Sequence, residues 1–189
     1  MNRFAPPRWS LIAALAALAL VAAVASLLFG AVDLSVARLF AAATGSGDKV
    51  ASIILFDLRL PRTVLALAVG AMLGLAGAAL QGYLRNPLAE PSVLGTSNAA
   101  ALGGVAAIYF GLAEIHPIIL PLLATGGALV SLALLFVLAG KAESPLTLIL
   151  AGIAVGTLAV AGTSLALNLS PNPFAAMEIM TWLLGSLVF

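Results

Sequence analysis

The feature that most constrains this chain is an uncharged run of 22 residues, Thr63–Leu84, which has an arginine immediately before it and another immediately after it. A helix that spans a bilayer needs ~20 consecutive apolar residues. The run combines leucine, valine, alanine and glycine and contains no Asp, Glu, Lys or Arg. It therefore predicts a transmembrane helix.

Further uncharged runs of similar length extend this prediction to the whole chain. Of the 189 residues, 63% are hydrophobic and only 8% are charged, whereas a soluble domain usually carries ~25% charged residues. The sequence predicts an all-α, polytopic transmembrane helical bundle, a single domain over residues 1–189 with about five membrane-spanning helices. The expected spans lie near residues 11–30, 63–84, 93–113, 117–140 and 146–169.

The two ends of the chain allow more than one interpretation. Residues 11–30 follow Arg3 and Arg8 as a signal peptide would, but the apolar run is longer than the ~7–15 residues of a signal core, so we expect a retained helix. The same two arginines favour a cytoplasmic amino terminus, although the basic residues as a whole divide evenly between the two sides of the membrane. Residues 174–189 fit either an interfacial helix or part of a further element.

Between the first two spans, residues 31–58 are more polar and contain the turn sequence Thr44–Gly47. They suit two short amphipathic helices that flank a turn.

Composition also excludes several classes of function. A net charge of +1 gives no field for nucleic acid, and with no cysteine and one histidine the chain lacks a metal-ligand pattern. No phosphate-binding GxxxxGK[ST] motif, catalytic constellation or cofactor motif is present. Because the expected spans hold no carboxylate, a proton-coupled carrier is disfavoured.

Small residues at helical spacing predict where helices pack closely in lipid. Four recur at intervals of four in the span near 63–84, and a GxxxG pair lies in the span near 146–169. The packing residues are Ala66, Gly70, Gly74 and Ala78 in the first set, and Gly152 and Gly156 in the second.

Polar residues near the spans each allow a structural and a functional interpretation. Arg59 and Arg62 could anchor the chain at the membrane surface, or they could bind carboxylates of a soluble partner through their planar guanidinium groups. The loop Arg85–Pro91 is made rigid by two prolines and could be a simple connection, or it could hold Asn86 and Leu88 against a central passage. One helical face could be packing or the lining of a path, and it carries Thr157, Ala161, Ser164 and Asn168.

An ordered series of short motifs resembles the signature of the FecCD-type permeases, the membrane subunits of binding-protein-dependent ABC importers for ferric siderophores, haem and cobalamin. Similarity extends from the first span to Phe189, and because family members are about twice as long, we expect this chain to be an amino-terminal half. The motifs are Arg59-Leu60-Pro61-Arg62, Gln81-Gly82, Arg85-Asn86-Pro87-Leu88-Ala89-Glu90-Pro91 and Val93-Leu94-Gly95-Thr96-Ser97-Asn98.

The resemblance implies a fold of about ten spans, a homodimer of permease subunits, a separate ABC ATPase and an external substrate-binding protein. It implies that Arg59 and Arg62 dock the binding protein, and that the helix near 146–169 lines the translocation path. It also implies a cytoplasmic gate formed by Asn86 and Leu88, to which the start of the last span adds Pro145 and Leu146.

We therefore expect a permease subunit in the bacterial inner membrane, with its amino terminus in the cytoplasm, that provides the path for an iron-siderophore, haem or cobalamin-like chelate. We expect no enzymatic activity in this chain. The alternatives are a secondary carrier or channel, and a membrane scaffold that transports nothing.

Overall fold

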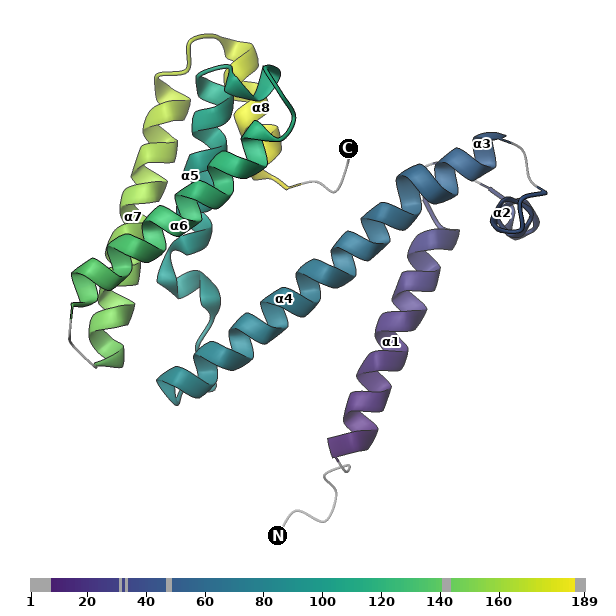
Figure 1. Ribbon diagram of the computed structural model, residues 1–189, viewed down its shortest axis with the longest axis horizontal. Coiled ribbons are helices and arrows are strands. Elements are labelled where there is room, and N and C mark those ends of the chain that lie inside the picture. Colours follow the sequence, from purple (N-terminus) through teal and green to yellow (C-terminus); the bar gives the residue numbers. More distant parts are fainter. Residues whose placement is uncertain (1–7, 31, 33, 47–48, 141–143, 186–189) are drawn as a thin grey trace. The chain divides into compact units, whose positions relative to one another are not determined.

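The computed structural model describes residues 8–30, 32, 34–46, 49–140 and 144–185, without the side chains of Arg8 and Pro145. Every regular element in these ranges is a helix and none is a strand, so the all-α prediction is confirmed (Figure 1). The chain forms two compact units, and the boundary between them in the sequence falls between Met72 and Leu73, inside one long helix.

The first unit begins with two helices of very different length. Helix α1 runs over Arg8–Leu28, and α2, Val36–Ala43, is a short amphipathic helix, as the sequence predicts for this region. Ser35 caps α2, because its hydroxyl accepts a hydrogen bond from the Arg38 amide at 3.3 Å. The cap fixes where the chain leaves the extended conformation and starts the helix.

A small apolar core joins α2 to the next helix. The buried residues come from one face of α2 and from the start of that helix, and leucines at the end of α1 pack against them. The opposite side of α2 is open, since Phe40 is exposed. The buried residues are Leu39, Ala42, Ala51 and Leu55.

The next helix is longer than the sequence predicts. It starts as α3, Lys49–Ser52, continues through a π-helical segment, Ile53–Arg59, and becomes α4, Leu60–Leu84. The expected span begins at Thr63, because Asp57, Arg59, Pro61 and Arg62 precede it. In the structure the helix continues through all four of these residues.

The π-helical segment explains how the helix accommodates Pro61. Proline has no amide hydrogen, and its ring presses on the carbonyl four residues earlier in an α-helix. The Leu60 amide bonds instead to the carbonyl of Leu55, five residues back, which widens the helix immediately before the proline. We attribute the π-helical turn to Pro61, since prolines and π-bulges are usual causes of irregularity within long helices.

The second unit is a bundle around α5, Thr96–Tyr109. The other helices of the bundle are α6, α7 and α8, all of which contact α5 (Figure 1). Two short 3₁₀ turns, Pro91–Leu94 and Leu112–Glu114, precede and follow α5. The helices that pack on α5 are α6, Ile119–Ala139, α7, Pro145–Asn168, and α8, Pro173–Leu183.

Glycines allow α5 and α6 to approach until their backbones touch. A Cβ atom on Gly103 would collide with the carbonyl oxygen of Leu123, and one on Gly127 would collide with the carbonyl oxygen of Ala99. Small residues permit this kind of close contact between helices in lipid.

Within the segment 174–189, which the sequence leaves open, the structure describes helix α8 and the residues that follow it up to Gly185. Helix α8 packs on α5 through Ile179, which is fully buried with Val105 and Ile108. The ring of Trp182 lies over Gly104, where an added Cβ would be 2.7 Å from the ring atom Cζ2. Helix α8 thus belongs to the bundle.

Among the described residues, four helices are long and apolar enough to cross a membrane: Trp9–Leu28, Lys49–Leu84, Ile119–Ala139 and Leu146–Asn168. The remaining expected span, 93–113, is shorter than predicted. Its helix, α5, has 14 residues and is therefore about 21 Å long, less than the ~30 Å hydrocarbon core. Two glycines with positive φ, at 95 and 111, interrupt the apolar run.

Candidate functional site

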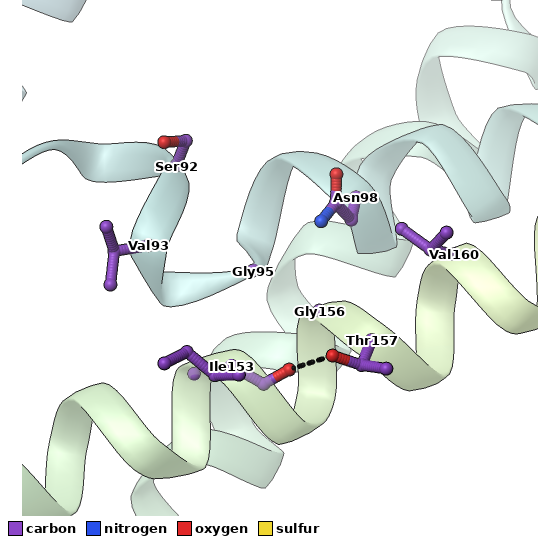
Figure 2. A pocket seen from close by; sticks show the side chains of 9 residues that line it. Ser92, Val93, Gly95, Asn98, Ile153, Gly156, Thr157 and Val160 are labelled. Atoms are coloured by element: carbon purple, nitrogen blue, oxygen red, sulfur yellow. Dashed lines mark hydrogen bonds between the residues drawn. The ribbon is translucent and has the colours of Figure 1, made fainter.

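The described residues of the second unit form an uncharged groove where the chain before α5 crosses α7 (Figure 2). Its volume is about 380 Å³. One side comes from the 3₁₀ turn and the first turn of α5, and the other from the middle of α7. The lining residues are Ser92, Val93, Gly95, Asn98, Gly152, Ile153, Gly156, Thr157 and Val160.

Gly95 makes the crossing possible. Its φ of 70° is in the left-handed region, where residues with a side chain are strained. A Cβ atom at this position would also lie 2.5 Å from the carbonyl oxygen of Gly152 and 2.6 Å from the backbone nitrogen of Gly156. Both the backbone conformation and the space available therefore require glycine.

The GxxxG pair of α7 receives this segment. A Cβ atom on Gly152 would lie 2.8 Å from the Leu94 Cα, and one on Gly156 would lie 3.0 Å from the Gly95 Cα. The sequence predicts that Gly152 and Gly156 pack closely against another helix. In the structure they pack against the short connection that leads into α5, so the glycine pair positions one side of the groove.

The groove offers neutral hydrogen-bonding groups from Ser92, Asn98 and Thr157, which are exposed. The Thr157 hydroxyl donates to the Ile153 carbonyl at 2.7 Å, as the dashed line in Figure 2 shows, so only its lone pairs remain for a solute. Figure 2 also shows Asn98 on the first turn of α5, close to α7. With no charged side chain in its lining, the groove can orient a solute weakly and cannot hold it by an ion pair.

The exposed polar face of α7 continues beyond the groove. Thr157 lies in the groove, while Ala161, Ser164 and Asn168 follow on the same side of the helix and are all exposed. The Asn168 side-chain amide donates to the carbonyl of Ser164 at 2.7 Å. Polar groups at membrane depth face a protein surface or water in preference to lipid. This face therefore suits contact with an aqueous path or with another part of the protein.

The loop Arg85–Glu90 is held by local hydrogen bonds. The Asn86 side chain accepts from the Leu88 amide at 2.9 Å, and the Asn86 carbonyl accepts from the Ala89 amide at 3.1 Å. Arg85 adopts a positive φ of 49°. As a result, Leu88 projects outward and is 87% exposed.

The expected gate residues do not line the groove. Asn86 and Leu88 lie in the loop that precedes the 3₁₀ turn, and Leu146 is exposed at the start of α7. The side chain of Pro145 lies outside the described residues.

The two arginines that precede α4 have different surroundings. Arg59 is buried, and its guanidinium bonds to the carbonyls of Leu27 and Leu28 at the end of α1 and to that of Val32 beyond it. This differs from the expectation that both side chains face a soluble partner. Arg62, one turn later, is only half-buried.

The small-residue stripe of α4 is exposed. Around Gly70 and Gly74 the described residues of the respective units leave open space where a Cβ would stand. The stripe consists of Ala66, Gly70, Gly74 and Ala78.

Two features of these sites were not identified as functional from sequence. In the sequence Asn98 stands out only as the last residue of the motif that begins at Val93, although a glycine followed by three polar residues is a usable signal. Gly30, which lies against Arg59, gave no such signal because its role depends on tertiary contact. In the described ranges, no group of three His, Asp or Glu side chains is placed to hold a metal ion.

Comparisons with known proteins identify relatives along nearly the whole chain. An uncharacterised ABC transporter permease, YvrB of Bacillus subtilis (strain 168), is 41% identical over 152 residues, which are 78% of this chain and 42% of that protein. The vitamin B12 import system permease protein BtuC of Salmonella newport (strain SL254) is 39% identical over 130 residues, or 69% of this chain and 40% of BtuC.

A solved structure shares the fold as well. It is an ABC transporter assigned to the metal-chelate type, in an inward-facing conformation, with a TM-score of 0.78 and 35% identity, and the match covers 94% of this chain and 53% of that one. The chain thus spans about half the length of the relatives it matches. The sequence profile of the FecCD transport family matches residues 18–188. The chain therefore belongs to the FecCD transport family.

Proposed function

We propose that this chain is part of the membrane permease of a binding-protein-dependent ABC importer that moves a metal chelate or corrinoid, such as an iron-siderophore, haem or cobalamin-like compound. Family membership and a relative named for vitamin B12 import support this substrate class. A separate ABC ATPase supplies the energy, and two permease subunits assemble as a homodimer. The protein lies in the bacterial inner membrane with its amino terminus in the cytoplasm.

The observation that carries the proposal is the exposed polar face of α7. Thr157, Ser164 and Asn168 are neutral polar residues. They lie on a helix that is long and apolar enough to span a membrane. A large chelate must pass without being held tightly, because strong binding would prevent its release. A neutral face with few free hydrogen-bond donors meets that requirement better than a charged one.

The other candidate residues take roles at the two ends of the path. The stretch around the start of α4 is the proposed external docking site for the substrate-binding protein, and of its two arginines the half-buried Arg62 is more accessible than the buried Arg59. On the cytoplasmic side, the rigid loop with Asn86 and the exposed Leu88 forms a gate together with Pro145 and Leu146. The exposed stripe of α4 packs against another helix of the assembled permease.

Cysteine accessibility tests the role of the α7 face. These 189 residues contain no cysteine, and any cysteine elsewhere in the assembly is first replaced by serine. Single cysteines replace Thr157, Ala161, Ser164 and Asn168 in the full-length permease, assembled with its ATPase in proteoliposomes. We expect a membrane-impermeant, water-soluble thiol reagent to modify all of them and to reduce ATP-dependent uptake of vitamin B12 or a ferric siderophore.

Leu158 and Leu169 provide controls, because they are exposed on α7 or at its end and lie about 90–110° around the helix from the centre of the polar face. Cysteines at these two positions should react slowly. Equal modification of both sets would remove the α7 face from the path. Uptake that proceeds without ATPase would instead support a secondary carrier or channel.

A further inference from the structure

A further groove in the second unit lies where α5, α6 and α7 meet, and we call it the Ser131 groove. Its volume is about 260 Å³. Exposed apolar side chains from α6 and α7 form its rims, and small residues of all three helices lie between them. The rim residues are Val130, Leu134 and Leu158, and the small residues include Gly103, Gly127 and Ala159.

Ser131 is the one residue that brings a polar side chain to this lining. It is only 1% exposed. Among the described residues, its hydroxyl oxygen has no hydrogen-bond partner. A hydroxyl that is buried without a partner costs free energy, because it has lost its bonds to water and gained none. The groove therefore contains a hydrogen-bonding group that still requires a partner.

Other hydroxyls on the long helices of this unit are satisfied locally. The Thr125 hydroxyl donates to the Pro121 carbonyl at 2.8 Å, and the Thr157 hydroxyl donates to the Ile153 carbonyl at 2.7 Å. This bond to the carbonyl four residues earlier is the usual solution for such a side chain in a helix. Ser131, by contrast, bonds to none of the described residues, so its hydroxyl is available to a group from outside α6.

The depth of Ser131 limits what that group can be. Helix α6 has 21 residues, and Ser131 lies two residues beyond the middle one, Leu129, which is about 3 Å along the helix axis. Lipid acyl chains have no hydrogen-bonding group at that depth. A buried water molecule needs two to four polar partners, roughly, and the other lining residues contribute no polar side chain. A polar side chain from another helix meets the requirement better.

That helix is not found among the first two long helices of this chain. Residues 11–25 of α1 and 64–80 of α4 contain no hydroxyl, amide or charged side chain. The polar residues of α7 lie on its exposed face, which we assign to the translocation path. The relatives contain about as much chain again, because this chain spans 42% of YvrB and 53% of the solved structure. A partner helix in that additional part is therefore the best candidate.

We propose that the Ser131 groove is the docking surface for a transmembrane helix from the part of the same permease subunit that lies outside these 189 residues. Near its middle the helix presents a serine, threonine, asparagine or glutamine, which hydrogen-bonds to Ser131. Small residues and hydrogen bonds between helices are the contacts that hold membrane helices together. This inference rests on the proposal that the chain is part of a longer permease, and it is independent of the compound transported.

Photochemical cross-linking identifies what occupies the groove. Benzoylphenylalanine replaces Val130 on one rim or Leu158 on the other, in the full-length permease in nanodiscs, and cross-linked peptides are found by mass spectrometry. We expect both positions to cross-link to one segment outside these 189 residues, in a product with the mass of a single subunit. Phe136 is the control, because it is exposed and lies about 140° around α6 from Ser131. It should not capture that segment.

The other occupants of the groove give different products, and each would overturn the proposal. Cross-links to lipid alone would show that acyl chains fill the groove. Cross-links to α1 or α4 would assign it to the first unit of this chain, and a product with the mass of two subunits would assign it to a second copy. Expected cross-links in a permease that takes up neither vitamin B12 nor a ferric siderophore would leave the docking inference intact and count against the proposed substrates.

Removal of the hydroxyl tests the hydrogen bond itself. Ser131→Ala in the full-length permease should lower the thermal midpoint by a few degrees, because the partner side chain is left buried and unsatisfied. Thr125→Ala is the control, since that hydroxyl bonds within its own helix, and its effect should be smaller. A midpoint that rises or stays unchanged in Ser131→Ala would show that the hydroxyl has no partner, and the proposal would be wrong.

A double-mutant cycle connects the two measurements. The polar residue nearest the middle of the cross-linked segment is replaced by alanine, alone and together with Ser131→Ala. Two residues that share one hydrogen bond show non-additive effects. We expect the double variant to have a midpoint no lower than that of the less stable single variant. Additive losses would mean that the two side chains do not contact each other.

Discussion

Single residues set the geometry of the groove, and Gly95 shows this best when compared with Gly111. Both have a φ near +65 to +70°, so both are glycines for the same conformational reason. Their surroundings differ. A side chain on Gly95 would meet the backbone of α7, whereas a side chain on Gly111 would meet no described atom within 4 Å. Substitutions at these two glycines therefore distinguish the free-energy cost of backbone strain, which both share, from the cost of a steric clash, which only Gly95 has.

The corresponding prediction compares Gly95→Ala with Gly111→Ala. Each alanine is strained by ~1–2 kcal/mol in the left-handed region, but only at position 95 does the methyl group force α7 away, which typically costs ~1–3 kcal/mol more. Gly95→Ala should therefore lower the thermal midpoint of the purified permease clearly more than Gly111→Ala. Equal midpoints would show that the contact between Gly95 and α7 is not tight.

At the scale of elements, α7 combines two functions on different faces. Its glycine pair, Gly152 and Gly156, packs against the connection before α5, and its polar face from Thr157 onward is exposed. Helix α4 has a small-residue face as well, but in each unit that face is open. Small residues stabilise a membrane helix by allowing another helix to pack closely against it. An exposed stripe of small residues therefore favours a further helix as its partner.

A substitution in this face of α4 tests whether it is occupied in the assembled permease. Gly74→Leu should reduce expression and thermal stability more than Leu73→Ala, because the large side chain would push a neighbouring helix away. Leu73 is the matched control, because it immediately precedes Gly74 in the same helix and is also exposed. Variants of equal stability would indicate that lipid, rather than protein, covers the stripe.

The sequence predicts the elements well where apolar runs end at polar turns. Helices α1, α6 and α7 agree with the expected spans to within a few residues. The prediction of 93–113 is too long because Gly95 and Gly111 look like ordinary small residues in an apolar run, and their positive φ is visible only in the structure. The predicted start of the long helix is too late, because charged residues and Pro61 normally mark a helix boundary and the local sequence does not show that a π-helical turn accommodates the proline.

The sequence predicts those parts of the candidate site that depend on helical spacing, but not those that depend on tertiary contacts. The polar face of α7 follows from helical spacing alone, so Thr157, Ser164 and Asn168 could be grouped without coordinates. The burial of Arg59 could not, because it depends on where α1 ends and on the space beside Gly30, which are tertiary facts.

For the whole molecule, the membrane orientation determines which end of the path each candidate residue occupies. The arginine pair near the start of α4 and the Asn86 loop at its end are separated by one span, so they lie on opposite sides of the membrane if the helix crosses it. The arginines before the first span favour a cytoplasmic amino terminus. The docking and gate roles are compatible only with that orientation.

Reporter fusions test this orientation. If α5 crosses the membrane together with the 3₁₀ turns on either side of it, three spans lie between Gly47 and Lys141. A reporter inserted after Gly47 should then be external, and one inserted after Lys141 should be internal. Alkaline phosphatase activity at the first site and green fluorescence at the second would agree with the proposal. The reverse pattern would exchange the two ends of the path and remove the start of α4 as the docking site.

The contact between α8 and α5 also allows intrinsic tryptophan fluorescence to report on the packing of the second unit. The chain has two tryptophans. Trp182 lies against Gly104 in the bundle, while Trp9 near the amino terminus is exposed. Emission from the indole of Trp182 depends on whether α8 remains docked on α5. When Trp9 is replaced by phenylalanine, Trp182 is the remaining tryptophan of these 189 residues. The fluorescence of this chain would then report whether α8 is packed on α5, without an attached dye.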